Sequence, residues 1–279
     1  MSLGRLAGLA IGIALVVIVL GPLALLFATS LKGDPNQILR DLGNLNAFWI
    51  APSDISFANY RDVLNDRQSP FLVFMMNSIL IVAGIVASGV FVNSMAAFAL
   101  ARLRFKGRQP LLAVIVALII IPIEALAVPL LIMSNRMGLL ETLIVQIVPF
   151  IAHPFSIYLF YQFFTKLPKD LDEAALVEGA TPFQIYSEIV MPLSGPVVAT
   201  VAILQSLQYW NAYLWPLMVT RGPEARPVSL ALAQFFGTPP PAWGQLMAFS
   251  VMMSLPILVV YLIFQRWFIQ SVVSSAVKG

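Results

Sequence analysis

Side chains that could carry chemistry are few and scattered in this sequence. Within its long apolar runs the only acid or histidine side chains are Glu124 and His153, whereas an active site needs paired titratable groups in one pocket. A single histidine and no cysteine exclude multi-histidine metal sites, thiolate nucleophiles and disulfides. The GxxxxGKS/T phosphate-binding loop and the GxSxG and HExxH motifs are also missing. These features predict a chain that is not an enzyme and binds no metal.

Five of the thirteen acids lie in one stretch, DLDEAALVEGATPFQIYSEIVMP, which covers residues 170–192. Carboxylates and a preceding proline favour a helix N-terminus, and DEAALVE is a strong helix former. Gly179 then suits a helix end, because glycine adopts the left-handed conformation. Thr181 and Gln184 form a T-x-x-Q capping box for a second helix, which Pro192 ends. The stretch is therefore predicted to be two short helices joined by a turn, too short to cross a membrane.

The rest of the sequence predicts a helical membrane protein. Hydrophobic residues make up 59% and charged residues 10% of the chain, against about 25% charged residues in soluble domains. A helix needs about 20 apolar residues to cross the bilayer, and its backbone groups pair internally. The predicted fold class is all-α, with six transmembrane helices at residues 6–28, 71–101, 110–133, 142–164, 193–219 and 246–269.

Basic residues predict which side of the membrane each loop faces. The loop ARLRFKGRQ contains four basic residues and no acid, and short basic loops stay in the cytoplasm. Alternation then places both termini and residues 165–192 inside. Residues 30–70, 134–141 and 220–245 are placed outside, and the last of these loops is proline-rich and expected to be ordered. Because the basic residues lie in loops, the net charge of +3 indicates topology and no nucleic-acid partner.

Polar side chains inside predicted spans are candidates for lining a translocation path, since such groups in lipid are usually functional. Sugars suit amides for their hydroxyls and aromatic rings for their apolar faces. The alternative for the amides is hydrogen bonding between helices, and the alternative for the acid is a structural pair. His153 precedes a proline, which favours packing at a kink over proton relay. The candidates for the path are Glu124, Gln205, Gln208, Tyr209 and Asn211.

Several motifs resemble one transport family. Glu173-Ala174-Ala175, then Gly179, Ile189 and Pro192, are similar in spacing to the EAA coupling motif of ABC importer membrane subunits, with Met191 where the motif has leucine. The segments AAFALARLRFKGR, YWNAYLWPL and the C-terminal SAVKG resemble the maltose-type carbohydrate importers, with Ser275 replacing the usual glycine. The resemblance covers about residues 70–279.

The resemblance implies a type I ABC importer transmembrane fold and a role as permease subunit for a sugar or sugar derivative in a bacterial or archaeal cytoplasmic membrane. The partners implied are a second homologous permease, two cytoplasmic ATPase subunits that carry ATP and Mg²⁺, and an extracytoplasmic solute-binding protein. The EAA residues Glu173, Ala174, Ala175, Gly179, Ile189 and Pro192 would contact the ATPase, and so would the tail, Val277, Lys278 and Gly279. Residues 221–245 correspond to the loop that reaches into the binding protein.

The organisation expected is a first helix and outer loop in residues 1–69, a core transmembrane domain in 70–270 with coupling helices at 168–192, and a cytoplasmic tail in 271–279. One alternative is an importer for a polyol or glycerol phosphate. Another is an ion-driven secondary transporter, which needs paired intramembrane acids, whereas Glu124 is alone. A membrane scaffold without transport is the third, and it would not need polar residues deep in the spans.

Overall fold

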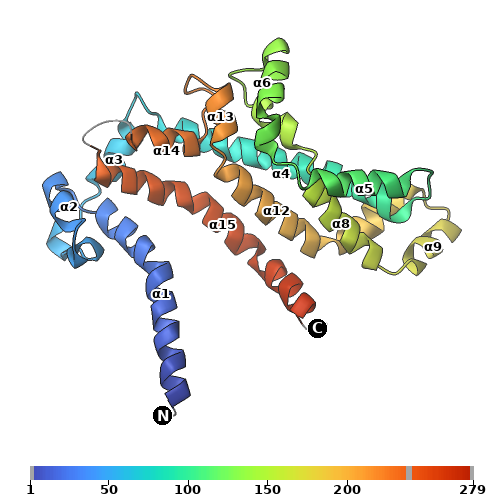
Figure 1. The fold of residues 1–279 in the computed structure, drawn as a ribbon, viewed down its shortest axis with the longest axis horizontal. Helices are drawn as coiled ribbons and strands as arrows, with labels where there is room; N and C mark the ends of the chain where they lie inside the picture. The colour runs from blue at the N-terminus through green and yellow to red at the C-terminus, as the bar shows by residue number, and fades with distance from the viewer. Residues whose placement is uncertain (1–2, 237–240, 277–279) are drawn as a thin grey trace. The chain divides into compact units, whose positions relative to one another are not determined.

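The computed structural model describes residues 3–236 and 241–276 and forms two compact units. The first unit comprises residues 1–76 and 227–255, and the second comprises residues 77–226 and 256–279. Helices form nearly all the regular structure of the described residues (Figure 1). The first unit contains α1 (Leu3–Ser30), α2 (Pro35–Asp41), η1 (Leu45–Phe48), η2 (Pro52–Asp54), α3 (Ala58–Asn65) and α14 (Val228–Phe236).

The second unit holds most of α4 (Phe71–Arg102) and the end of α15 (Trp243–Ala276), both of which begin in the first unit. Within the second unit α8 packs against both α5 and α12 (Figure 1). Its other elements are α5 (Arg108–Leu118), η3 (Ile123–Leu126), α6 (Ala127–Arg136), α7 (Ile144–Ile147), η4 (Val148–Phe150), α8 (Pro154–Lys166), α9 (Asp170–Val177), α10 (Pro182–Gln184), the π-helix η5 (Ile185–Val190), α11 (Met191–Leu193), α12 (Gly195–Trp210) and α13 (Leu214–Val219).

By length and composition, three continuous helices of the described chain can cross a membrane, in Gly8–Ser30, Phe71–Arg102 and Trp243–Gln265. Three bent pairs bring the number to six if each pair is one span. One pair, Arg108–Leu118 with Ile123–Arg136, bends by 95°, as the prolines around Glu124 predict. The others bend by 45° between Ile144–Phe150 and Pro154–Lys166, and by 78° between Pro182–Leu193 and Gly195–Trp210.

The fifth predicted span differs from a single helix over residues 193–219. Helix α12 ends at Trp210, and a separate short helix, α13, begins at Leu214. At the break, the side-chain amide of Asn211 donates to the carbonyl oxygen of Leu207 at 2.9 Å, and such local bonds compete with helical hydrogen bonding. Pro216 then lies in the first turn of α13, where proline is tolerated.

The 45° bend between α7 and α8 is held by Asn93, which is fully buried on α4. Its Nδ2 donates to the Ile151 carbonyl oxygen at 3.0 Å, and its Oδ1 accepts from the His153 backbone N–H at 2.9 Å. His153 is the N-cap of α8, and its Nδ1 accepts from the Ser156 N–H at 3.3 Å. His153 therefore has the packing role at a kink that the sequence favours.

Replacing Asn93 by leucine should destabilise the protein by about 2–4 kcal/mol, because two partly buried backbone groups lose their partner at about 1–2 kcal/mol each, the lower part of the range for buried groups. Thermal unfolding of the detergent-solubilised protein measures this effect. Asn211→Leu is the matched control, since Asn211 is exposed and its amide bonds only within its own helix turn. Equal destabilisation by the two variants would contradict the assigned role of Asn93.

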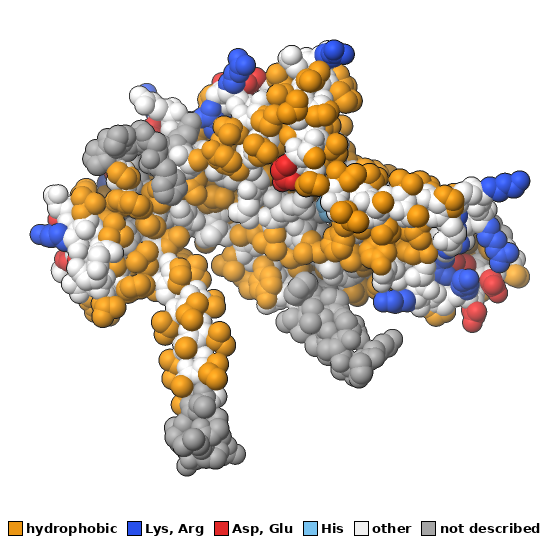
Figure 2. Space-filling view, viewed as in Figure 1, with side chains coloured by type: hydrophobic (Ala, Val, Ile, Leu, Met, Phe, Trp, Pro, Cys, Tyr) orange, Lys and Arg blue, Asp and Glu red, His pale blue; other side chains and the backbone are white. Residues whose placement is uncertain are grey.

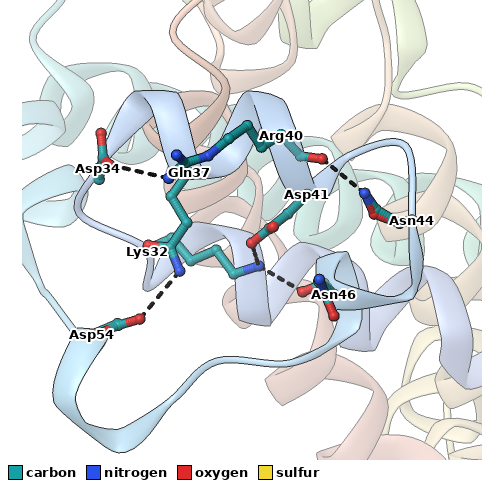
Figure 3. Close-up of polar contacts among 8 residues, drawn as sticks. All are labelled: Lys32, Asp34, Gln37, Arg40, Asp41, Asn44, Asn46 and Asp54. Atoms are coloured by element: carbon teal, nitrogen blue, oxygen red, sulfur yellow. Dashed lines mark hydrogen bonds and ion pairs between the residues drawn. The ribbon is translucent and has the colours of Figure 1, made fainter.

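The predicted first outer loop folds around a buried lysine. The Lys32 side chain is 1% exposed, and its Nζ donates to Asp41 Oδ2 and to the Asn46 carbonyl oxygen, both at 2.7 Å (Figure 3). Asn59 on α3 donates to the carbonyl oxygens of Ser30 and Lys32 at 3.0 and 2.8 Å. A buried charge needs such pairing, and these contacts hold α2, η1 and α3 at the end of α1.

Candidate functional site

The acidic segment, residues 170–193, forms the two short helices that the sequence predicts. Gly179 ends the first with φ of 87°, and its N–H donates to the Leu176 carbonyl oxygen at 3.1 Å. Thr181 and Gln184 form the predicted capping box at the start of α10. The sequence did not indicate that the helix continues as a π-helix, η5, and then as α11 to Leu193. Such π-helical turns are rare and often lie at functional sites.

One face of the acidic segment is buried in the second unit. Ala175, Ile185 and Val190 belong to a hydrophobic core together with residues of α4, α8 and α12. The Tyr186 ring lies edge-on to Phe98 at 5.5 Å, and its hydroxyl is 2.8 Å from the Ser94 hydroxyl in a buried hydrogen bond. The segment therefore packs on the helices of its own unit through side chains from both of its parts.

An ion pair joins α9 to the end of α4. Arg102 Nη1 is 3.2 Å from Asp172 Oδ2, and the two side chains are 4% and 16% exposed. Arg102 Nη2 also donates to the Leu167 carbonyl oxygen at 3.0 Å, just before α9. Burial raises the pKa of the Asp172 carboxyl above its ordinary value, and the Arg102 charge offsets only part of that rise. Because desolvation exceeds the attraction, the pair contributes more to orientation than to stability.

The opposite face of the acidic segment is exposed and apolar at its tip. Val177 is 89% exposed and Phe183 is 58% exposed. Leu171 and Leu176 are also exposed, and the carboxylates of Glu173 and Glu178 lie beside them in sequence. Figure 2 shows acidic and basic side chains gathered at the end of the second unit that carries α9, while hydrophobic side chains cover much of the rest. Exposed apolar side chains rimmed by charges are typical of a protein-binding surface.

The structure places the predicted motif residues on both faces of the segment. Glu173 and Ala174 are exposed, whereas Ala175 is buried against the core of its own unit. Gly179 forms the exposed turn between the helices, and Pro192 is exposed near the bend into α12. Ile189 is partly buried against the same core as Ala175. Ala174, and not Ala175, is thus the alanine that a partner could approach.

The five residues predicted for a translocation path differ in exposure and in their partners. Gln205 is 1% exposed and donates to the Ser156 hydroxyl at 3.2 Å, which is the helix-to-helix role stated as its alternative. The Tyr209 ring packs on Phe150 at 5.2 Å. Glu124, Gln208 and Asn211 are exposed on the single chain. The predicted tail, Val277, Lys278 and Gly279, lies outside the described residues.

Sequence reasoning missed the partnership of Arg102 and Asp172. In the sequence, Arg102 is only one of the four basic residues that indicate a cytoplasmic loop, and Asp172 is only one of the acids that favour a helix start. Arg102 is the last residue of an apolar helix, and a charge at that position can be expected to need a partner. Which residue is that partner depends on the tertiary structure.

Comparisons with known proteins agree with the geometry. The sequence profile of the family described as "Binding-protein-dependent transport system inner membrane component" matches residues 89–274. The trehalose transport system permease protein SugB of Mycobacterium tuberculosis (strain CDC 1551 / Oshkosh) is 34% identical over 262 residues, 92% of each chain. The arabinooligosaccharides transport system permease protein AraQ of Bacillus subtilis (strain 168) is 32% identical over 258 residues, 92% of this chain and 90% of that protein.

A solved structure shares the fold. It is described as a bacterial ABC transporter involved in the import of the acidic polysaccharide alginate, and one of its chains superposes with a TM-score of 0.80. The superposition covers 96% of this chain and 99% of that one at 23% sequence identity. The helical fold, with its bent spans, is therefore that of an ABC importer permease.

Proposed function

The chain belongs to the family of binding-protein-dependent transport system inner membrane components, and from this premise we propose that it is the permease subunit of an ATP-driven importer for a sugar or sugar derivative. The observation that carries the proposal is the acidic segment. It has one face buried in the core of its own unit and one face with exposed apolar side chains, among them Val177 and Phe183. A segment of this kind can transmit the movement of a docked protein to the helices behind it.

The docked protein is a cytoplasmic ATPase subunit. This chain has no phosphate-binding loop, so ATP and Mg²⁺ belong to two separate ATPase subunits. Val177 and Phe183 supply apolar contacts, and Glu173 and Glu178 supply carboxylates that suit arginine or backbone amides. The tail residues Val277, Lys278 and Gly279 are a second contact with the ATPase. Closure of the ATPase dimer favours the outward-facing helices only through contacts that differ between the two states.

The remaining partners complete the importer. A second homologous permease pairs with this chain, and a solute-binding protein delivers the sugar from outside. Both termini and the acidic segment face the cytoplasm, as the basic loop after α4 indicates. The carbohydrate class rests on the sugar-transport permeases at 32% and 34% identity. Glu124, Gln205, Gln208, Tyr209 and Asn211 stay candidates for the path, and Gln208 and Asn211 are accessible on the single chain.

Co-purification tests the docking. We expect the tagged chain to retain its ATPase and second permease, and Val177→Asp to lose most of the ATPase, because the substitution places a charge in an apolar contact. Leu45→Asp is the matched control, since Leu45 is 84% exposed on the predicted outer side. The second permease should stay bound in both variants. Retention of the ATPase by Val177→Asp at the level of Leu45→Asp would contradict the docking surface.

A further inference from the structure

Glu141 has an unusual backbone conformation. Its φ is 61°, and it is the one residue other than glycine with a positive φ in the described part of the chain. Residues with a side chain adopt this region at a cost of order 1–3 kcal/mol and keep it only where surrounding contacts impose it. Glu141 lies just before the fourth span, in the short segment predicted to face outside.

The contacts that impose this conformation all lead to one other segment. The Glu141 N–H donates to the Val219 carbonyl oxygen at 3.0 Å. The Glu141 carboxylate accepts from the Arg221 N–H at 2.7 and 2.9 Å and from the Gly222 N–H at 3.1 Å. Hydrogen bonds to an ionised carboxylate are roughly twice as strong as neutral ones. Glu141 thus holds the backbone of residues 219–222, where α13 ends and the following segment begins.

Two buried amides hold the rest of that segment. Asn77 Nδ2 lies 3.3, 2.9 and 3.0 Å from the carbonyl oxygens of Pro223, Glu224 and Arg226. Gln146 on α7 donates to the Ala225 carbonyl oxygen at 2.6 Å. We call Asn77, Glu141, Gln146 and residues 221–226 the outer junction; all of it lies in the second unit. It joins the outer ends of α4, α7 and α13 through one six-residue segment.

We propose that Glu141 is a positioning residue that fixes the outer junction as the surface on which the solute-binding protein docks. This inference rests on the proposed function. Arg221, Pro223 and Glu224 are exposed, while the backbone beneath them is bound to three spans. A protein that contacts these residues therefore acts on three spans together. Without the Glu141 carboxylate, the backbone N–H groups of Arg221 and Gly222 lose their acceptor. Binding of the solute-binding protein then has to order these residues, which weakens its affinity.

The test uses the complete complex of both permeases and the ATPase in nanodiscs, with the sugar-loaded binding protein added in increasing concentration. The measurement is the binding-protein concentration that gives half-maximal stimulation of ATP hydrolysis. Glu141→Gln keeps the side-chain shape and removes the charge. We expect the half-saturating concentration to rise about tenfold, as when charged hydrogen bonds become neutral or are lost, with little change in the maximal rate. A purely structural defect would instead lower the maximal rate.

Two further variants keep the inference falsifiable. Asp66→Asn is the matched control, because Asp66 Oδ1 also accepts two backbone N–H groups, from Gln68 at 2.8 Å and Ser69 at 3.2 Å, but only within its own turn. It should behave as the wild type. Glu141→Gly relieves the backbone strain but removes the carboxylate, so it should match Glu141→Gln. The role of Glu141 is overturned if either Glu141 variant has the half-saturating concentration of the wild type, or if Asp66→Asn raises that concentration equally. A wild-type complex that no binding protein stimulates overturns the proposed function instead.

Discussion

Replacing Gly179 by proline should reduce solute uptake to background while leaving the chain inserted in the membrane. The φ of Gly179 is 87°, whereas the proline ring fixes φ near −65°. Proline also removes the N–H that donates to the Leu176 carbonyl oxygen. The turn between α9 and α10 must therefore rearrange, at a cost of about 3 kcal/mol or more, and the exposed apolar tip loses its shape. Uptake of labelled sugar by cells is the measurement.

A matched pair of alanine variants separates coupling from general strain. Gly179→Ala and Gly107→Ala both place a side chain at a φ near 90°, with no neighbouring atom within 4 Å of the new Cβ, so each costs about 1 kcal/mol of backbone strain. Only Gly179→Ala should lower uptake. Because the chain has no cysteine, labelling of single introduced cysteines checks insertion directly. Full uptake by both Gly179→Pro and Glu173→Lys would refute coupling through this segment.

Removing the positive charge of Arg102 should uncouple ATP hydrolysis from uptake. In Arg102→Met the Asp172 carboxylate stays largely buried but loses its partner, which costs roughly 2–3 kcal/mol, below the range for fully buried pairs. Helix α9 also loses the bond from Arg102 to the Leu167 carbonyl oxygen. The acidic segment then keeps its core contacts but not its attachment to the end of α4. Uptake per ATP hydrolysed by the reconstituted complex measures the loss.

The pH dependence of this variant follows from the Asp172 pKa. Burial already raises that pKa, and loss of the Arg102 charge raises it further. A raised carboxyl pKa gives stability that is present at low pH and is lost as pH rises through the folded-state value. Arg102→Met should therefore recover stability on acidification, and adding Asp172→Asn should restore it at neutral pH. Arg104→Met, which removes an exposed charge two residues away, should change neither the stability nor the uptake per ATP hydrolysed. An equal loss in Arg104→Met would contradict a specific role of the Arg102–Asp172 pair.

Local sequence signals determined much of this protein. The apolar runs indicate the helices that can cross a membrane, because only length and composition matter for that property. Thr181, Gln184 and Gly179 define the two helices of the acidic segment, since capping and left-handed turns depend on neighbours within a few residues. The prolines on either side of Glu124 indicate the break in the third span for the same local reason. The family and the carbohydrate class are implied by the resemblance of the EAA-like motif and of segments such as YWNAYLWPL to those of known importers.

Other features depend on residues that are distant in sequence, and only the tertiary structure decided them. The burial of Ala175 depends on a core built from α4, α8 and α12. The pairing of Arg102 with Asp172 depends on where α4 ends relative to α9. The strained Glu141 depends on the position of Arg221 and Gly222. Each depends on contacts between residues far apart in the sequence, whereas hydrophobic periodicity and capping rules describe only residues within a few positions of one another.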